Sequence, residues 1–185
     1  MLTHHNFTAN CFAASEKIDV TEKDIALSFL PLRHVFERLA GYYFMIFHGA
    51  AIHYAESMQT VPSDLARVRP TVAASVPRLY EKIYARILEA VEASPALRRN
   101  LFSWAARTGR QRAQARLSGR PVGLSLVLKF FIAKKLVFTK LKNRLGGRIR
   151  FFISGGAPLA KELAAFLSPA AVMLLAGYGL TATSP

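Results

Sequence analysis

Cysteine is almost absent from this 185-residue chain, which contains only Cys11. A single cysteine excludes an intrachain disulfide. Because residues 1–20 also lack the features of a secretory signal, the chain is predicted to work in a reducing, intracellular setting. Cys11 itself lies in an apolar helical segment, and we expect it in the core.

The chain also lacks an apolar run long enough to cross a membrane, since a spanning helix needs roughly 20 largely apolar residues. The most apolar stretch, residues 122–138, is interrupted by Lys129, Lys134 and Lys135. These lysines do not share one helical face. The pattern therefore fits either a half-buried helix whose lysines reach out to solvent or a helix that lies against lipid. It favours burial against the rest of a protein.

Acidic residues are scarce, with 11 Asp and Glu against 25 Lys and Arg, and none lies within residues 93–160. Fifteen basic residues fall in that stretch. A field of this sign attracts phosphates in nucleic acid, anionic lipid or nucleotide cofactors, or it is balanced by acidic parts of a larger protein. Nucleic acid is the least favoured partner, because the arginines do not alternate with exposed aromatic residues in any known module.

Apolar side chains, by contrast, make up 52% of the chain, which excludes a disordered polyelectrolyte. Five short apolar runs are typical of strands that are covered on both faces, and longer helical patterns alternate with them. This alternation predicts an α/β fold, a mostly parallel sheet with crossover helices, in which residues 97–145 form a helical insertion. The predicted strands are residues 25–30, 50–54, 71–75, 149–153 and 171–175, and the predicted helices are residues 3–15, 34–47, 77–92, 97–117, 124–145 and 159–167.

Two glycine-bearing turns follow predicted strands, SGGAP at residues 154–158 and AGYGLT at residues 176–181. In open α/β sheets, ligands bind beyond the carboxyl ends of the strands. Glycines there let a flat ring or a phosphate approach the backbone closely. The two turns are candidates for a nucleotide pocket, although tight turns between strand and helix need glycine for their geometry as well.

Several segments, in this order, resemble the adenylate-forming (AMP-binding) synthetases, and among them the long-chain fatty acyl-CoA synthetases. They are MLTHHNF, LPLRHVFER, RPTVAASVPRLYEKI, LVFTKLKNRLGGRIRFF, IRFFISGGAPL and GYGLT. The resemblance runs over nearly the whole chain. It implies a single incomplete AMP-binding domain at residues 1–185, with the family's phosphate loop before residue 1 and its small C-terminal domain after residue 185.

The resemblance further implies a two-step activation of a long-chain fatty acid. The fatty carboxylate would attack the α-phosphate of ATP, and the thiol of coenzyme A would then displace AMP, with Mg²⁺ neutralising charge. His34 matches the family's histidine near the carboxylate, Tyr178 would pack against the purine, and the Thr181 hydroxyl would contact the α-phosphate. The nucleotide pocket would be formed by Gly155, Gly156, Ala157, Pro158, Gly177, Tyr178, Gly179 and Thr181.

One departure from the family concerns the metal. The family's last motif reads YGLTE, and its glutamate helps to hold Mg²⁺, whereas Ala182 stands at that position here. Mg²⁺ is usually held by only one or two protein carboxylates, and a methyl group cannot replace one. No metal ligand is therefore predicted in this chain. Glu37 and Arg38, beside His34, are expected to form a structural polar pair rather than catalytic groups.

Two functions remain open from the sequence. The first is ATP-dependent ligation of a long-chain fatty acid to coenzyme A, in the cytoplasm and with a peripheral contact at the inner face of an anionic membrane; the fragment alone is expected to be inactive. The alternative is a non-catalytic basic fragment, derived from such a synthetase, that binds membranes or anions.

Overall fold

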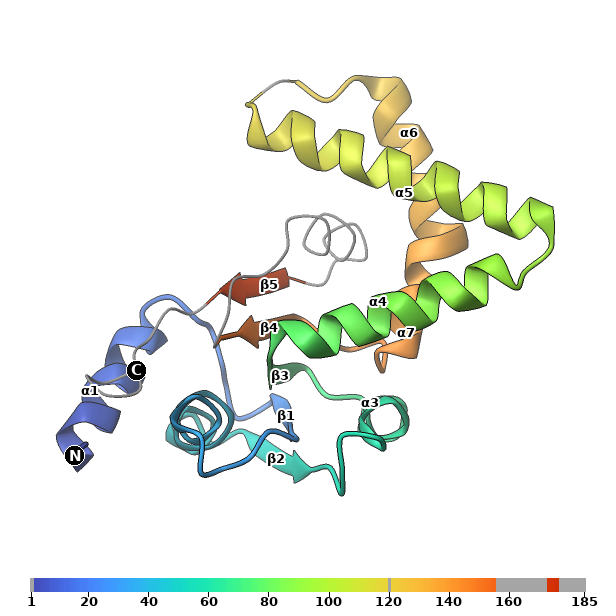
Figure 1. Cartoon of the computed structure of the whole chain (residues 1–185). Coiled ribbons are helices and arrows are strands. Elements are labelled where there is room, and N and C mark those ends of the chain that lie inside the picture. Colours follow the sequence, from blue (N-terminus) through green and yellow to red (C-terminus); the bar gives the residue numbers. More distant parts are fainter. Residues whose placement is uncertain (1, 120, 156–172, 177–185) are drawn as a thin grey trace.

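A five-stranded parallel sheet lies at the centre of the computed structural model, which describes residues 2–119, 121–155 and 173–176 (Figure 1). The strand order is β2-β1-β3-β4-β5. All five strands match predicted apolar runs to within two residues at their starts, and the predicted α/β fold is confirmed. The strands are β1 (Ile25–Ser28), β2 (Ala51–Tyr54), β3 (Val72–Ser75), β4 (Phe151–Ser154) and β5 (Met173–Ala176).

Most predicted helices are present, with three differences. The predicted helix at residues 34–47 begins as a π-helix, the one at residues 124–145 is an unbroken succession of α-, π- and α-helix, and α3 was not predicted. The predicted helix at residues 159–167 lies outside the described residues. The helices are α1 (His4–Ser15), η1 (Glu37–Tyr43), α2 (Phe44–Phe47), α3 (Val61–Val68), α4 (Pro77–Glu92), α5 (Ala96–Leu117), α6 (Leu124–Ala133), η2 (Lys134–Phe138) and α7 (Thr139–Arg144).

Side chains of the strands alternate between two apolar layers, as the two-residue period of a strand requires. In β4, Phe152 packs with the layer that α3, α4 and α7 contribute, while Phe151 and Ile153 pack with the layer of α1, η1 and α2. Cys11 is buried in the second layer, as predicted. Because both faces of the sheet are covered, its functional groups gather at the ends of the strands.

The amino ends of three strands are tied together by Asp24, which precedes β1. Its buried carboxylate accepts hydrogen bonds from Arg150 Nη1 at 2.7 and 2.9 Å and from Thr71 Oγ1 at 2.6 Å. Burial alone would raise the pKa of Asp24, but the hydrogen bonds from Thr71 and the Thr21 N–H, together with the Arg150 guanidinium, outweigh it and lower the pKa. Asp24 is therefore ionised and structural at neutral pH.

The predicted helical insertion is present, and its α6 helix projects beside α5, away from the sheet (Figure 1). Leu124, Leu128 and Phe131 occupy one face of α6 at helical spacing and are 90%, 62% and 66% exposed. Among the described residues, only the opposite face of α6, around Ala133, is buried. We call Leu124, Leu128 and Phe131 the α6 row.

No helix in the described part of the chain combines the length and the apolar character that a membrane crossing requires.

Candidate functional site

Hydroxyl groups line the carboxyl edge of the sheet. β1 ends in Ser28, β3 in Ser75 and β4 in Ser154, and β2 ends in Tyr54. The parallel register pairs Ser75 with Ser154 and Ser28 with Tyr54, so these groups form a row across neighbouring strands. Hydroxyls donate and accept hydrogen bonds, and this is the edge at which open α/β sheets bind ligands.

Gly155 and the segment that carries His34 meet at this edge. A Cβ atom at Gly155 would lie 2.7 and 2.8 Å from Cδ2 and Cζ of Phe36, closer than real Cβ atoms approach other atoms. The Gly155 N–H donates to the Ser75 carbonyl oxygen at 3.3 Å, which holds the start of the loop against β3. Glycine is thus required here because the Phe36 ring lies directly against the backbone. Two pieces of the predicted site, 121 positions apart in the sequence, are brought together.

His34 is exposed at the start of this segment. Its Nδ1 accepts a hydrogen bond from the Phe36 N–H at 3.2 Å. In the neutral ring the proton must therefore reside on Nε2, which leaves that atom as a donor. Such a donor suits a carboxylate or a phosphate oxygen.

Glu37 is fully buried three residues further on, and its surroundings correct one expectation. The Ser28 hydroxyl donates to Glu37 Oε1 at 2.5 Å, whereas Arg38 Nε donates to the Leu32 carbonyl oxygen at 3.1 Å, so the expected pair of Glu37 with Arg38 is wrong. Adjacent residues on a helix point in different directions, and of these two residues only Glu37 is buried.

Burial raises the pKa of Glu37 to about 7, an effect that the Ser28 hydroxyl partly counters. Its Oε2 makes no hydrogen bond to a described residue. Gly41, one turn later in η1, is packed so closely that a Cβ there would lie 2.6 Å from the Glu37 carboxyl carbon. At neutral pH this carboxyl is therefore partly protonated and, when protonated, can donate a hydrogen bond at the edge of the sheet.

Tyr80, in the first turn of α4, brings a further hydroxyl to Ser75 and Ser154 at the ends of β3 and β4. Burial raises the pKa of Tyr80, and the hydroxyls of Ser75 and Ser154 counter part of that rise, which places the three groups together. Tyr80 and Ser154 make no hydrogen bond of good geometry through these hydroxyls to any described residue. These buried hydroxyls therefore form one polar cluster at the ends of β3 and β4.

Sequence reasoning missed Ser28, Ser75 and Tyr80, whereas Ser154 begins the predicted SGGAP turn. One signal was present, because the predicted strand at residues 71–75 ends in Ser75. Of the predicted site residues, the structure describes His34 and Gly155. The others lie outside the described residues, namely Gly156, Ala157, Pro158, Gly177, Tyr178, Gly179 and Thr181, and so does Ala182.

The described residues do not suit Mg²⁺. Residues 2–119, 121–155 and 173–176 contain no group of three or more His, Cys, Asp or Glu side chains that could hold a metal ion. Glu37 is a poor ligand, because its raised pKa leaves it partly protonated at neutral pH.

Comparison with known proteins agrees with this geometry. The sequence model of the family described as AMP-binding enzyme matches residues 1–185. The chain is 39% identical over its whole length to a peroxisomal long chain acyl-CoA synthetase 6 of Arabidopsis thaliana. It is 32% identical, over 99% of its length, to a putative fatty-acid–CoA ligase of Mycobacterium tuberculosis. The chain spans 25% and 32% of the lengths of these relatives.

Solved structures share the fold. The adenylation domain of a carboxylate reductase from Mycobacterium chelonae superposes with a TM-score of 0.65 at 24% identity, over 95% of this chain and 23% of that one. The N-terminal domain of FACL13 from Mycobacterium tuberculosis gives a TM-score of 0.59 at 18% identity, over 97% of this chain and 33% of that one. Because the family model matches the chain along its entire length, the chain belongs to the AMP-binding, adenylate-forming enzyme family.

Proposed function

We propose that this chain contributes the adenylate-binding part of a ligase that joins a long-chain fatty acid to coenzyme A. In the first step a carboxylate oxygen of the acid forms a bond to the α-phosphorus of ATP, and pyrophosphate leaves. In the second step the sulfur of coenzyme A forms a bond to the acyl carbon, and AMP leaves. The long-chain class is supported by the names of the curated relatives.

The observation that carries the proposal is the contact of Phe36 with Gly155. It joins the loop proposed to hold the nucleotide to the segment proposed to hold the carboxylate, so the two reactants would meet at one edge of the sheet. Bringing them together supplies much of the rate in a reaction of this kind.

Each group at the edge has a proposed task. The Nε2–H of His34 orients the fatty carboxylate, and the hydroxyls of Ser154 and Tyr80 support the glycine loop or donate to the nucleotide. Negative charge grows on the phosphate as the new bond forms, so fixed donors aimed at it lower the barrier. In the family, ATP-dependent adenylation uses Mg²⁺ to neutralise this charge. Since the described residues do not suit the metal, no step is assigned to it here.

The test is a graft in which this chain replaces the matching quarter of a long-chain family member. With ATP, Mg²⁺ and coenzyme A, the graft carrying Ala182→Glu should form palmitoyl-CoA and should use acetate at least tenfold less efficiently. Thioester formation is read by mass spectrometry. A graft that is folded but forms no thioester from any fatty acid would exclude the ligase.

A second candidate function, binding to a membrane, is supported by the α6 row. Its exposed apolar side chains lie close in sequence to Lys129, Lys134 and Lys135. An interfacial helix that binds anionic lipid has this composition. We propose a peripheral contact at the cytoplasmic face of an anionic membrane, although two relatives are named as peroxisomal.

Vesicle co-sedimentation tests this contact. The double variant Leu128→Ser and Phe131→Ser should release the chain from anionic vesicles. Its control is Phe12→Ser, because Phe12 is 63% exposed on a different helix, α1. Equal release by the control would contradict binding through the α6 row. Equal binding to zwitterionic vesicles would show that charge does not drive the contact. Neither result bears on the proposed ligase.

A further inference from the structure

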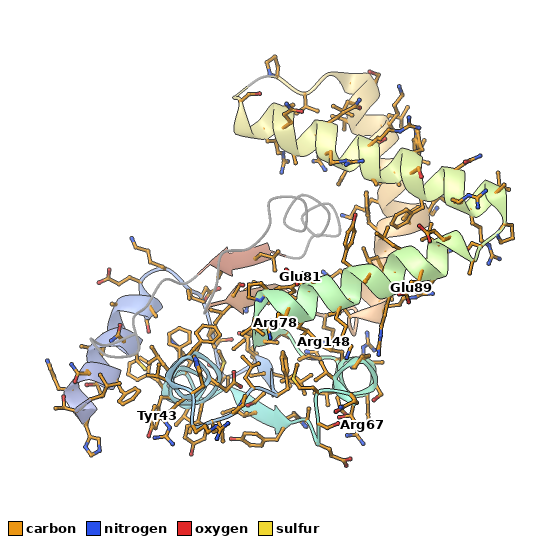
Figure 2. The ribbon with its side chains drawn as sticks, in the orientation of Figure 1. Tyr43, Arg67, Arg78, Glu81, Glu89 and Arg148 are labelled. Carbon is orange, nitrogen blue, oxygen red and sulfur yellow. The ribbon has the colours of Figure 1, made fainter. Side chains whose placement is uncertain are left out.

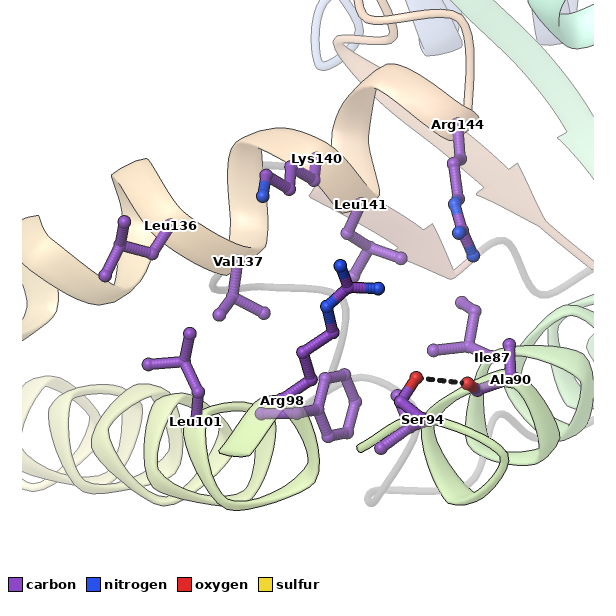
Figure 3. A pocket seen from close by; sticks show the side chains of 12 residues that line it. Ile87, Ala90, Ser94, Arg98, Leu101, Leu136, Val137, Lys140, Leu141 and Arg144 are labelled. Carbon is purple, nitrogen blue, oxygen red and sulfur yellow. Dashed lines mark hydrogen bonds between the residues drawn. The ribbon is translucent and has the colours of Figure 1, made fainter. Parts of the chain in front are cut away.

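Two adjoining hollows lie between α4 and α7, on the helical side of the molecule. The first has a volume of about 360 Å³ and extends to α5 (Figure 3). The second has a volume of about 220 Å³ and extends to α3. Ile87, Leu141 and Arg144 line both, so the two hollows adjoin at these residues. We call the pair of hollows the α4–α7 groove.

The walls of the groove are long; they are largely apolar in the second hollow and part polar, part apolar in the first. On α4 they run from Leu79 to Val91, a distance of about 18 Å at 1.5 Å per residue. Leu136 and Val137 of η2 continue the apolar wall of the first hollow, opposite Leu101 of α5 (Figure 3). Small-molecule sites are mostly apolar clefts of roughly this volume, with a few polar groups that orient the ligand.

The polar groups of the groove are all of one sign. Five cations line it and no carboxylate does, and none of the five makes an ion pair within the part of the chain that the structure describes. Glu81 and Glu89, which Figure 2 labels on α4, line neither hollow. The five cations are Lys82, Arg86, Arg98, Lys140 and Arg144.

Their spacing is unfavourable for the protein by itself. Lys82 and Arg86 are four residues apart on α4, and Lys140 and Arg144 are four residues apart on α7. Like charges at this spacing destabilise a helix. Figure 3 shows Arg98, Lys140 and Arg144 entering the same hollow from two helices. No described carboxylate makes an ion pair with these three cations, and an anion between them would lower their mutual repulsion.

We propose that the α4–α7 groove binds a single-chain lipid with an anionic headgroup, a carboxylate or a phosphate. The headgroup lies between Arg98, Lys140 and Arg144, and the chain lies along Ile87 and Leu141. An inorganic anion would not contact the apolar wall, and a neutral chain would leave the five cations without an anionic partner. None of His34, Glu37 or Gly155 lines the groove, so the site does not rest on the proposed function.

Equilibrium dialysis of the full chain against four probes tests the site. The probes are oleate and dodecyl phosphate, each below its critical micelle concentration, inorganic phosphate, and the neutral lipid monoolein. One molecule of oleate or dodecyl phosphate should bind per chain, at least tenfold more tightly than inorganic phosphate or monoolein. Oleate alone would identify a carboxylate site, and dodecyl phosphate alone a phosphate site.

Two variants test the groove, one by removing charge and one by filling its volume. The triple variant Arg98→Gln, Lys140→Gln and Arg144→Gln removes the charge and should weaken oleate binding at least tenfold. Ala90→Phe fills an exposed position of the first hollow without changing charge, and it should weaken binding to a similar degree. Circular dichroism and thermal unfolding verify that both variants are folded.

A matched control decides the outcome. Lys129→Gln with Lys134→Gln and Lys135→Gln removes the same charge from α6 and η2 and should leave oleate binding within twofold. Equal loss of oleate binding in this lysine control would show that net charge alone causes the effect. Unchanged binding in Ala90→Phe, or no oleate binding by the graft that completes the protein, would overturn the proposal.

Discussion

The Ser28 hydroxyl at the end of β1 donates a hydrogen bond of 2.5 Å to the buried carboxyl of Glu37 in η1. This bond links the sheet to the segment that carries His34. Because Glu37 is fully buried and its second oxygen has no partner among the described residues, the link depends on the protonation of the carboxyl.

Replacing Glu37 by Gln should remove a dependence of stability on pH. The pKa of Glu37 is raised from 4.5 to about 7 in the folded chain, so the folded state holds a proton that the unfolded state releases. The stabilising contribution is complete below pH 4.5 and is lost as pH rises through 7, on the order of 3 kcal/mol in all. Urea unfolding between pH 4.5 and 8 measures it. Glu37→Gln keeps an acceptor for Ser28 and should flatten this trend; the same slope in both proteins would show that Glu37 is ionised throughout.

Adding a methyl group at Gly155 should destabilise the chain by about 1–3 kcal/mol, because the Phe36 ring already occupies that space. The control is Gly123→Ala, since a Cβ at Gly123 meets nothing within 4 Å and its φ is −61°. Thermal unfolding of both variants gives the comparison. Equal melting temperatures for the two would mean that Phe36 moves away at no cost and that the contact does not organise the edge.

At the opposite edge, Asp24→Asn should cost about 2 kcal/mol at pH 7, since it weakens hydrogen bonds from Arg150 and Thr71 to a charged acceptor. The pKa of Asp24 is lowered in the folded chain, so its contribution is present above its usual value of 3.8 and is lost as pH falls through the folded pKa. Acid titration of both proteins followed by circular dichroism should show a shallower acid transition in the variant. An unchanged transition would assign the acid sensitivity to other carboxylates.

The chain alone should release pyrophosphate from ATP and palmitate only at background. In the graft, restoring the glutamate by Ala182→Glu should raise adenylation on the order of 100-fold, the usual effect of one group that stabilises charge in the transition state. A coupled pyrophosphate assay measures both. Equal rates with alanine and with glutamate would mean that another residue holds the metal, and turnover by the chain alone would contradict the first statement.

The strands were predictable because their signal is local. A strand covered on both faces is a short apolar run in any context, and Val72–Ser75 or Phe151–Ser154 could be found without knowing their neighbours. The short helix α3 was missed, although Val61, Leu65 and Val68 have helical spacing, because eight residues between two strands also fit a loop.

The interior of the site could not be predicted in the same way. Glu37 is buried because Gly41 leaves room for its carboxyl and because Ser28, nine residues earlier, ends its strand beside it. Glu37 and Gly41 lie in a π-helix, a rare conformation that the hydrophobic pattern of the sequence did not indicate. The family's motifs indicated His34 and Gly155, but the contact between their segments depends on the parallel register of β3 and β4.

The most direct test of the account is the binding of a sulfamoyl analogue of palmitoyl adenylate to the graft, measured by calorimetry. The account predicts one site per chain, weakened at least tenfold by Gly155→Ala and within twofold of the parent in Gly123→Ala, because the ligand lies where Phe36 meets the Gly155 loop. Binding that is equally strong in both variants would place the adenylate elsewhere and contradict the assignment of the carboxyl edge.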